Sequence, residues 1–353
     1  MQFEELKALP KVALHDHLDG GLRPQTVIDH LAEVGKEVPS QDAELLGQWF
    51  FDAADSGSLP AYLQTFDYTV AAMRSRDHLV RVAREAVEDL AADGVCVAEL
   101  RWAPEQHVSR ELSAPEAVEA VRDGLAEGVA AAEAKGQTIV ARQILTSMRH
   151  AEPSCEIAEL AVAYRDDSVA GFDIAGAEDG FPSTRFQKVF EYLRRQNFPY
   201  TIHAGEGAGA QSVHEAVQVC GTRRLGHGVR IIEDIDFSGD EPKLGRLAQY
   251  VLDQQIMLEV CPTSNLQTGI AERLEDHPVG RLHELGFNIS ISCDNRLMSG
   301  TSMTTEFARL AEAFGWGMAD FERLTRAALQ ASFLHHDEKQ RLAAGVVAAG
   351  YGH

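Results

Sequence analysis

The chain has 353 residues, 45% of them hydrophobic, and carries a formal net charge of −22 at pH 7. This length and composition allow a large buried core, and no stretch approaches the ~18 consecutive apolar residues that a membrane span requires. The negative charge would repel nucleic acid phosphates and acidic membrane surfaces, so we expect neither nucleic acid nor a membrane as a partner.

The cysteines and the opening residues indicate the compartment. The five cysteines are odd in number and scattered without CxxC spacing, which argues against a disulfide framework and against a thiolate zinc cluster. The first residues lack the basic, apolar and small-residue regions of a secretory signal. We therefore expect a soluble protein of the reducing cytoplasm.

Short β-branched and apolar runs alternate with longer amphipathic stretches, which is typical of βα units and a parallel sheet. Eight runs can be counted, at residues 12–14, 95–102, 138–146, 169–174, 200–202, 224–225, 256–260 and 287–293. Eight repeats in a chain of this length favour a TIM (β/α)8 barrel over an open doubly wound sheet. No linker or low-complexity segment divides the chain, so we predict an α/β fold with one domain over residues 1–353.

The stretches between the runs carry helix end signals. Ser113, Pro115 and Glu116 predict a capping box with proline in the first helical turn. Asp77 and Gly94 bracket another predicted helix.

The interval between the first two runs is longer than one helix, so we expect inserted helices after the first strand. Within it, one helical face gathers Leu59, Tyr62, Leu63 and Phe66. Such a stripe usually packs against the core, and it also fits an apolar lid over a pocket.

Histidines and carboxylates gather where the predicted strands end. His15 and His17 follow the first run, His203 the fifth, His227 the sixth and Asp294 the eighth. Barrel enzymes place their chemistry at the carboxyl ends of the strands, and residues two apart on a strand point the same way. An isolated HxH pair is more often two surface histidines, but this clustering favours a metal site. Three histidines and one aspartate are enough ligands for catalytic zinc.

Other residues near these candidates have different expected roles. Glu206, three residues beyond His203, is placed to act as a general acid or base. The glycine-rich stretch 205–209 resembles a phosphate cradle but lacks the Gly-Lys-Ser/Thr ending, and its glutamate would repel phosphate. For other histidines we expect surface or capping roles: His30, His78, His107, His214 and His283.

Five motifs, in order over nearly the whole chain, are similar to those of the adenosine deaminase family. They read LHDHLDG at 14–20, HAGE at 203–206, LGHG at 225–228, EVCPTSN at 259–265 and SCDN at 292–295. The resemblance implies an amidohydrolase barrel that deaminates adenosine and 2′-deoxyadenosine to inosine and 2′-deoxyinosine, with release of ammonia. It also implies one Zn²⁺ per chain, held by His15, His17, His203 and Asp294.

The resemblance assigns catalytic roles as well. Glu206 would protonate purine N1 as an activated water attacks C6, and His227 would orient that water and stabilise the developing charge. Asp294 would take the water's proton in addition to binding zinc. Together these roles would activate C6 as the electrophile and water as the nucleophile, and would assist the departure of ammonia.

The expected partner is a small-molecule purine nucleoside, contacted by His17, Asp19, Gly176 and Asn295. Asp19 would accept the ribose 5′-hydroxyl, and the Gly176 backbone N–H would donate to purine N3. Relatives acting on adenine or larger nucleosides tend to carry glutamate at the position of Asp19, so aspartate favours adenosine. Asn295 departs from the family, which commonly has an aspartate there that contacts N7. An asparagine amide donates in any protonation state.

Two alternatives stay open at this point. One is a related deaminase of adenine or of a modified adenine nucleoside. The other is a zinc-binding barrel without catalytic activity, against which the presence of Glu206, His227 and Asp294 counts. The sequence gives no oligomeric state.

Overall fold

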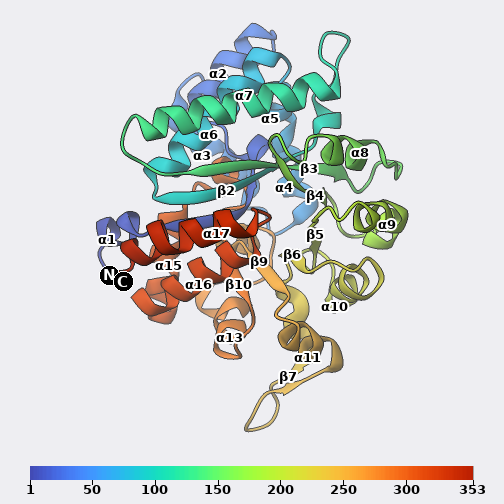
Figure 1. Ribbon diagram of the computed structural model, residues 1–353, viewed down its shortest axis with the longest axis vertical. Coiled ribbons are helices and arrows are strands. Elements are labelled where there is room, and N and C mark those ends of the chain that lie inside the picture. The colour runs from blue at the N-terminus through green and yellow to red at the C-terminus, as the bar shows by residue number, and fades with distance from the viewer. Residues whose placement is uncertain (353) are drawn as a thin grey trace.

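Eight parallel strands form the centre of the computed structural model, which describes residues 1–352 (Figure 1). The strands are β1 (Lys11–His17), β2 (Val95–Trp102), β3 (Val140–Met148), β4 (Val169–Ala175), β5 (Ile202–Ala204), β6 (Arg224–His227), β9 (Met257–Val260) and β10 (Ile289–Ile291). All eight predicted runs therefore correspond to strands. The fifth run is displaced, since β5 begins where that prediction ends.

The strands close into a barrel. They form two four-stranded parallel sheets, in the orders β1-β2-β3-β4 and β10-β9-β6-β5. Parallel bridges join the sheets at Phe172–Tyr200 and at Asp16–Asp294. At the second bridge the His17 N–H donates to the Asp294 carbonyl over 2.7 Å, and the Asp294 N–H donates to the His15 carbonyl over 3.0 Å. The closed arrangement confirms the predicted TIM barrel.

Helices surround the barrel. In chain order they are α1 (Phe3–Ala8), α2 (Pro24–Glu33), α3 (Ala43–Ala54), α4 (Leu59–Tyr62), α5 (Phe66–Ala71), α6 (Arg76–Ala92), α7 (Ala114–Glu133), α8 (Glu156–Ala163), α9 (Gln187–Arg195), α10 (Ala210–His214), α11 (Arg246–Asp253), α12 (Pro262–Gln267), α13 (Pro278–Glu284), α14 (Arg296–Ser299), α15 (Met303–Phe314), α16 (Met318–Ala331), α17 (His336–Leu342) and α18 (Ala348–Gly350). None of the helices within residues 1–352 has the length and apolarity to cross a membrane.

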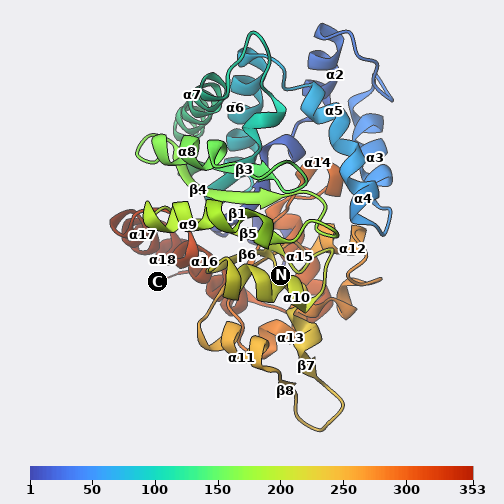
Figure 2. The same cartoon turned by 90° about the vertical axis from the view of Figure 1, so that its right-hand side faces the viewer.

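Helices α2 to α5 form the predicted insertion after the first strand, and they lie together on one side of the barrel near α12 and α14 (Figure 2). The stripe on residues 59–66 is not one continuous helix, because a 3-10 turn over Leu63–Thr65 separates α4 from α5. Tyr62 is buried, whereas Leu63 and Phe66 line a cavity. The core interpretation of the stripe therefore holds for Tyr62, Leu63 and Phe66 lie in the wall of the cavity, and Leu59 is half-buried.

Helix end signals in the sequence predicted the starts of two helices to within one residue. The capping box of α7 is confirmed: the Ser113 N–H donates to the Glu116 carboxylate over 2.8 Å, and the Glu116 N–H donates to the Ser113 hydroxyl. Helix α6 begins one residue before Asp77, with Ser75 as its N-cap. The small antiparallel pair β7 (Ile235–Asp236) and β8 (Lys243–Leu244) was not predicted.

The expectation of surface or capping roles was wrong for most of the remaining histidines. His214 is exposed, but the side chains that lie in the interior are His30, His78, His107 and His283. These imidazoles can be buried because a ring nitrogen finds a partner there. For example, His107 donates from Nδ1 to the Met73 carbonyl over 3.1 Å.

Candidate active site

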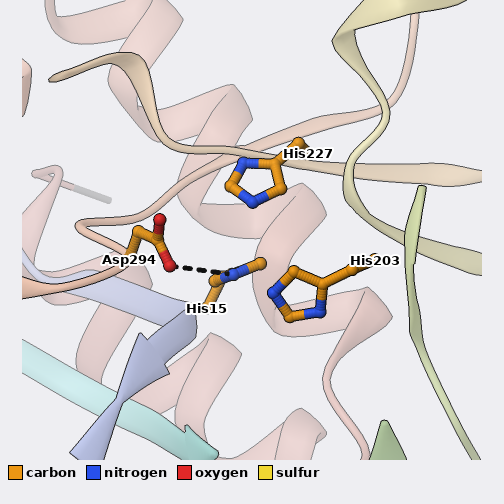
Figure 3. Close-up of side chains that lie close together, drawn as sticks. All are labelled: His15, His203, His227 and Asp294. Atoms are coloured by element: carbon orange, nitrogen blue, oxygen red, sulfur yellow. Dashed lines mark ion pairs between the residues drawn. The ribbon is translucent and has the colours of Figure 1, made fainter. Parts of the chain in front are cut away.

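Four predicted side chains point toward a common centre at the carboxyl ends of the barrel strands (Figure 3). His15, His203, His227 and Asp294 each offer one ligand atom, and these atoms lie within 4.8 Å of one another. All four are buried. The histidines of β1 and β6 lie within their strands, whereas the sequence placed them just after the runs.

His17 reaches the same centre from the end of β1. Its Nε2 lies 3.3 Å from Asp294 Oδ1 and 3.3 Å from His203 Nε2. The structure therefore brings together the four predicted ligands and His227. The donor set of imidazole nitrogens and one carboxylate suits a zinc ion.

Carboxylates behind two of the histidines orient them toward this centre. Glu259 Oε2 lies 3.1 Å from His15 Nδ1, and Asp173 Oδ2 lies 2.9 Å from His203 Nδ1. The Glu259 carboxylate can only accept, so the ring proton of His15 lies on Nδ1 and its Nε2 lone pair points inward. The Asp173 carboxylate favours the same tautomer for His203. His15 Nε2 is buried and makes no hydrogen bond within residues 1–352, although Asp294 Oδ1 lies 3.3 Å from it (Figure 3). A buried nitrogen lone pair that faces a carboxylate oxygen without a hydrogen bond fits a metal ion between the two atoms.

Glu259 belongs to a charged network in the barrel interior that sequence reasoning missed. Arg101 and Arg224 contact it at 2.7 and 2.6 Å. Burial acts to raise the pKa of the Glu259 carboxyl, but these two guanidinium groups hold it well below its usual range. Charged residues inside otherwise apolar strand runs were the available signal, since such residues are buried only when paired.

Backbone strain occurs at two of the site residues. His227 and Asp294 have φ values of +62° and +63°, a region that side chains other than glycine seldom adopt. Strain of this kind collects at functional sites.

Glu206 lies beside the centre, with Oε2 3.5 Å from His227 Nε2. Burial raises the pKa of its carboxyl well above the usual range, and the nearby charges of Asp294 and Glu178 add to this effect. The raised pKa favours the protonated form of Glu206, in which it can donate a proton.

The loop that carries Glu206 does form a cradle of N–H groups, and a side chain of this chain fills it. Glu178, in the loop after β4, accepts the backbone N–H groups of four consecutive residues, 205–208, over 2.7, 3.0, 2.6 and 2.9 Å. The Ser212 hydroxyl also donates to it. The sequence analysis gave Glu178 no role, and nothing local in the sequence signals this contact.

A cavity of about 800 Å³ opens next to the cluster. His17, Asp19 and Gly176 line it, together with the apolar side chains Leu63 and Phe66. Gly176 has a φ of +104°, which favours glycine and leaves its backbone accessible. Burial raises the pKa of Asp19 to about 7, and the charge of Asp294 acts in the same direction.

Asn295 is buried and lies against Gly20. A Cβ atom built on Gly20 would meet Asn295 Oδ1 at 1.9 Å, so the missing side chain makes room for the amide. The Tyr62 hydroxyl has Asn295 among its polar neighbours. Asn295 thus lies next to Asp294 but outside the residues that line the cavity.

Comparisons with known proteins agree with this geometry. A sequence profile of the family described as adenosine deaminase matches residues 10–349. The chain is 53% identical over 350 residues to adenosine deaminase 1 of Streptomyces coelicolor, across 99% of this chain and 88% of that protein.

Two solved structures share the fold. An amidohydrolase of Burkholderia ambifaria with bound Zn aligns with a TM-score of 0.83 and 24% identity, over 99% of this chain and 92% of that one. An adenine deaminase of Arthrobacter aurescens aligns with a TM-score of 0.82 and 24% identity, over 97% and 98%.

Proposed function

The chain belongs to the adenosine deaminase family, and we propose that it hydrolyses adenosine and 2′-deoxyadenosine to inosine and 2′-deoxyinosine with release of ammonia. The observation that carries the proposal is a buried Glu206, its carboxyl pKa raised by burial, beside an imidazole–carboxylate cluster that a cavity of about 800 Å³ adjoins. The reaction needs a proton donor at the purine and an activated water at C6, and this arrangement provides a place for both. We further propose a single-domain enzyme of the cytoplasm.

We propose one zinc ion as the cofactor, held by His15, His17, His203 and Asp294. When bound, zinc supplies Lewis acidity and lowers the pKa of a water molecule to about 7. The inward Nε2 lone pairs of His15 and His203 and the short contacts of His17 support this set. The Ser264 hydroxyl donates to Asp294 Oδ2 over 2.6 Å, which leaves Oδ1 for the cluster.

Different side chains around the cluster would donate the proton, accept the proton and orient the water. Glu206 donates its proton to purine N1, which removes the aromatic character that resists addition at C6. Asp294, whose pKa the neighbouring histidines hold low against the effect of burial, accepts a proton from the attacking water. His227 orients that water from the opposite side.

The cavity residues would hold the nucleoside. Asp19 accepts the ribose 5′-hydroxyl, the Gly176 N–H donates to purine N3, and His17 contacts the substrate where the cavity meets the cluster. Leu63 and Phe66 cover the apolar faces and exclude water, which strengthens the electrostatic interactions inside.

The first test replaces the proton donor. Glu206→Gln should keep the metal and lower kcat on adenosine by about 10²-fold or more, because an amide cannot deliver the N1 proton. Ammonia release and metal content are measured on the same preparation. A Glu206→Gln enzyme that keeps its kcat would exclude the assigned role, and a parent enzyme that releases no ammonia from adenosine would exclude the proposed function.

The second test concerns the nucleoside itself. Asp19→Ala should raise the KM for adenosine, with a loss of about 1–3 kcal/mol in binding, and leave turnover of 5′-deoxyadenosine almost unchanged. Adenine serves as the competing substrate. Equal losses on both nucleosides would show that Asp19 does not contact the 5′-hydroxyl, and faster turnover of adenine than of adenosine would favour the alternative deaminase.

A further inference from the structure

Three buried side chains connect helix α13 to the active site. His277 is the N-cap residue of α13, and its Nδ1 accepts the Val279 N–H over 3.0 Å. His277 Nε2 lies 3.3 Å from Asn265 Oδ1, and Asn265 Nδ2 lies 3.1 Å from His227 Nδ1. The side chains of His277, Asn265 and His227 are at most 2% exposed.

The proton positions along this chain follow from its first member. A backbone N–H can only donate, so His277 Nδ1 carries no proton and Nε2 carries one. Burial lowers the pKa of His277 to about 3, so the ring stays neutral. Its Nε2–H requires an acceptor, which places the Asn265 oxygen toward His277 and the Asn265 NH₂ group toward His227. Since an NH₂ group only donates, His227 Nδ1 must be the acceptor.

We propose that His277 and Asn265 are positioning residues that hold His227 as the neutral tautomer with its proton on Nε2, and that His227 therefore acts as a hydrogen-bond donor in the site. This inference rests on the proposed function for its catalytic meaning. His15 has the opposite tautomer, because the Glu259 carboxylate accepts from its Nδ1 atom, and we infer the same tautomer for His203, whose Nδ1 lies 2.9 Å from Asp173 Oδ2. The residues behind the three rings thus leave the Nε2 lone pairs of His15 and His203 free to bind a metal. Nε2 of His227 carries a proton instead and cannot bind one.

The tautomer also restricts what His227 can do in the reaction. A neutral imidazole with a proton on Nε2 can donate to the attacking oxygen and stabilise the charge that develops there. It cannot take the proton of the water through Nε2, and Nδ1 is already occupied by Asn265. The acceptor for that proton is then Asp294.

The test is Asn265→Asp, which keeps the shape of the side chain but reverses its hydrogen bonding to His227. A carboxylate can still accept from His277 Nε2–H, so the fold has no new unpaired group. It would also accept from His227 Nδ1–H, which moves the ring proton away from Nε2. We expect kcat on adenosine to fall about 10²-fold, the cost of one donor to a developing oxyanion, with KM changed by less than about 3-fold.

The direct readout is the ¹⁵N–¹H correlation spectrum of the imidazole rings in the zinc-loaded, ¹⁵N-histidine-labelled enzyme. The His227 signals are assigned by their loss in His227→Gln. We expect a protonated Nε2 in the parent and a protonated Nδ1 in Asn265→Asp. Asn288→Asp is the matched control: it makes the same chemical change at the amino end of β10, where the side chain donates to the Gln255 carbonyl, and should alter neither the spectrum nor kcat.

The outcomes separate this inference from the proposed function. A parent spectrum with the proton on His227 Nδ1 overturns the inference, and so does a loss of kcat in Asn265→Asp without a change of tautomer. A parent that shows the Nε2–H tautomer but does not deaminate adenosine overturns the proposed function and leaves the tautomer assignment in place.

Discussion

At the scale of single residues, Asn295 stands where the resemblance to the family implies an aspartate. An aspartate would have to be protonated to donate to purine N7, whereas an amide donates at any pH. Because residue 295 lies next to Asp294, an amide costs less free energy there than a second carboxylate, which the Asp294 charge would repel. Gly20 supports this arrangement by leaving space for the Asn295 side chain.

This argument predicts the behaviour of Asn295→Ala. If the Asn295 amide donates to purine N7, its loss should cost roughly 1–3 kcal/mol in kcat/KM on adenosine, about one to two decades. With 7-deazaadenosine, which lacks the N7 acceptor, parent and variant should differ much less. Gly20→Ala should act in the same direction, because the added methyl group displaces the amide without removing it. The same proportional loss on both nucleosides would show that Asn295 is not the N7 donor.

At the scale of elements, the site depends on contacts between loops that follow different strands. Glu178 follows β4 and Glu206 follows β5, and the Glu178 carboxylate joins the two loops through the N–H groups of residues 205–208. A carboxylate offers acceptor sites on both oxygens, which this number of donors requires. We expect this contact to fix the backbone on which the proton donor sits.

Glu178→Gln tests this expectation. The amide replaces one acceptor oxygen by a donor that faces other donors, so kcat should fall by about 10-fold or more while hydrogen exchange of the amides in 205–208 accelerates. Glu191→Gln on α9 is the control, because that carboxylate accepts from the Gln187 amide at an exposed position. In a Glu206→Gln background, Glu178→Gln should cost little more, since the two residues act as one unit. Additive losses would mean that Glu178 acts independently of Glu206.

The limits of prediction from the sequence also appear at this scale. Strands buried on both faces read as apolar runs, and capping boxes are local, so β2 and the start of α7 were placed correctly. The motif positions placed His15, His203 and Asp294 at strand ends that the barrel brings together. Contacts such as Glu178 with residues 205–208, or His277 with Asn265, depend on which loops meet in space. No periodicity in the sequence encodes that, and the break between α4 and α5 was missed for the same reason.

At the scale of the whole molecule, several histidines are buried as neutral rings at a distance from the cluster. Burial lowers the pKa of His107 to about 4 and, together with the charge of Arg323, that of His283 to about 4. In the unfolded chain these side chains regain the ordinary value of 6.5. Between these values the unfolded state binds protons that the folded state does not, so the free energy of unfolding falls as the pH falls.

His107→Gln isolates one of these contributions. The amide can still donate to the Met73 carbonyl, which His107 reaches at 3.1 Å, but it takes up no proton on unfolding. As the pH falls from 6.5 toward 4, the parent should lose stability relative to this variant by about 1.4 kcal/mol per pH unit. Urea unfolding of both proteins with excess chelator at each pH measures the difference, in which the protonation of the metal ligands cancels. His214→Gln, at an exposed imidazole, is the control for the substitution itself. If His107→Gln tracks the parent at every pH, the His107 ring is not held neutral by the fold.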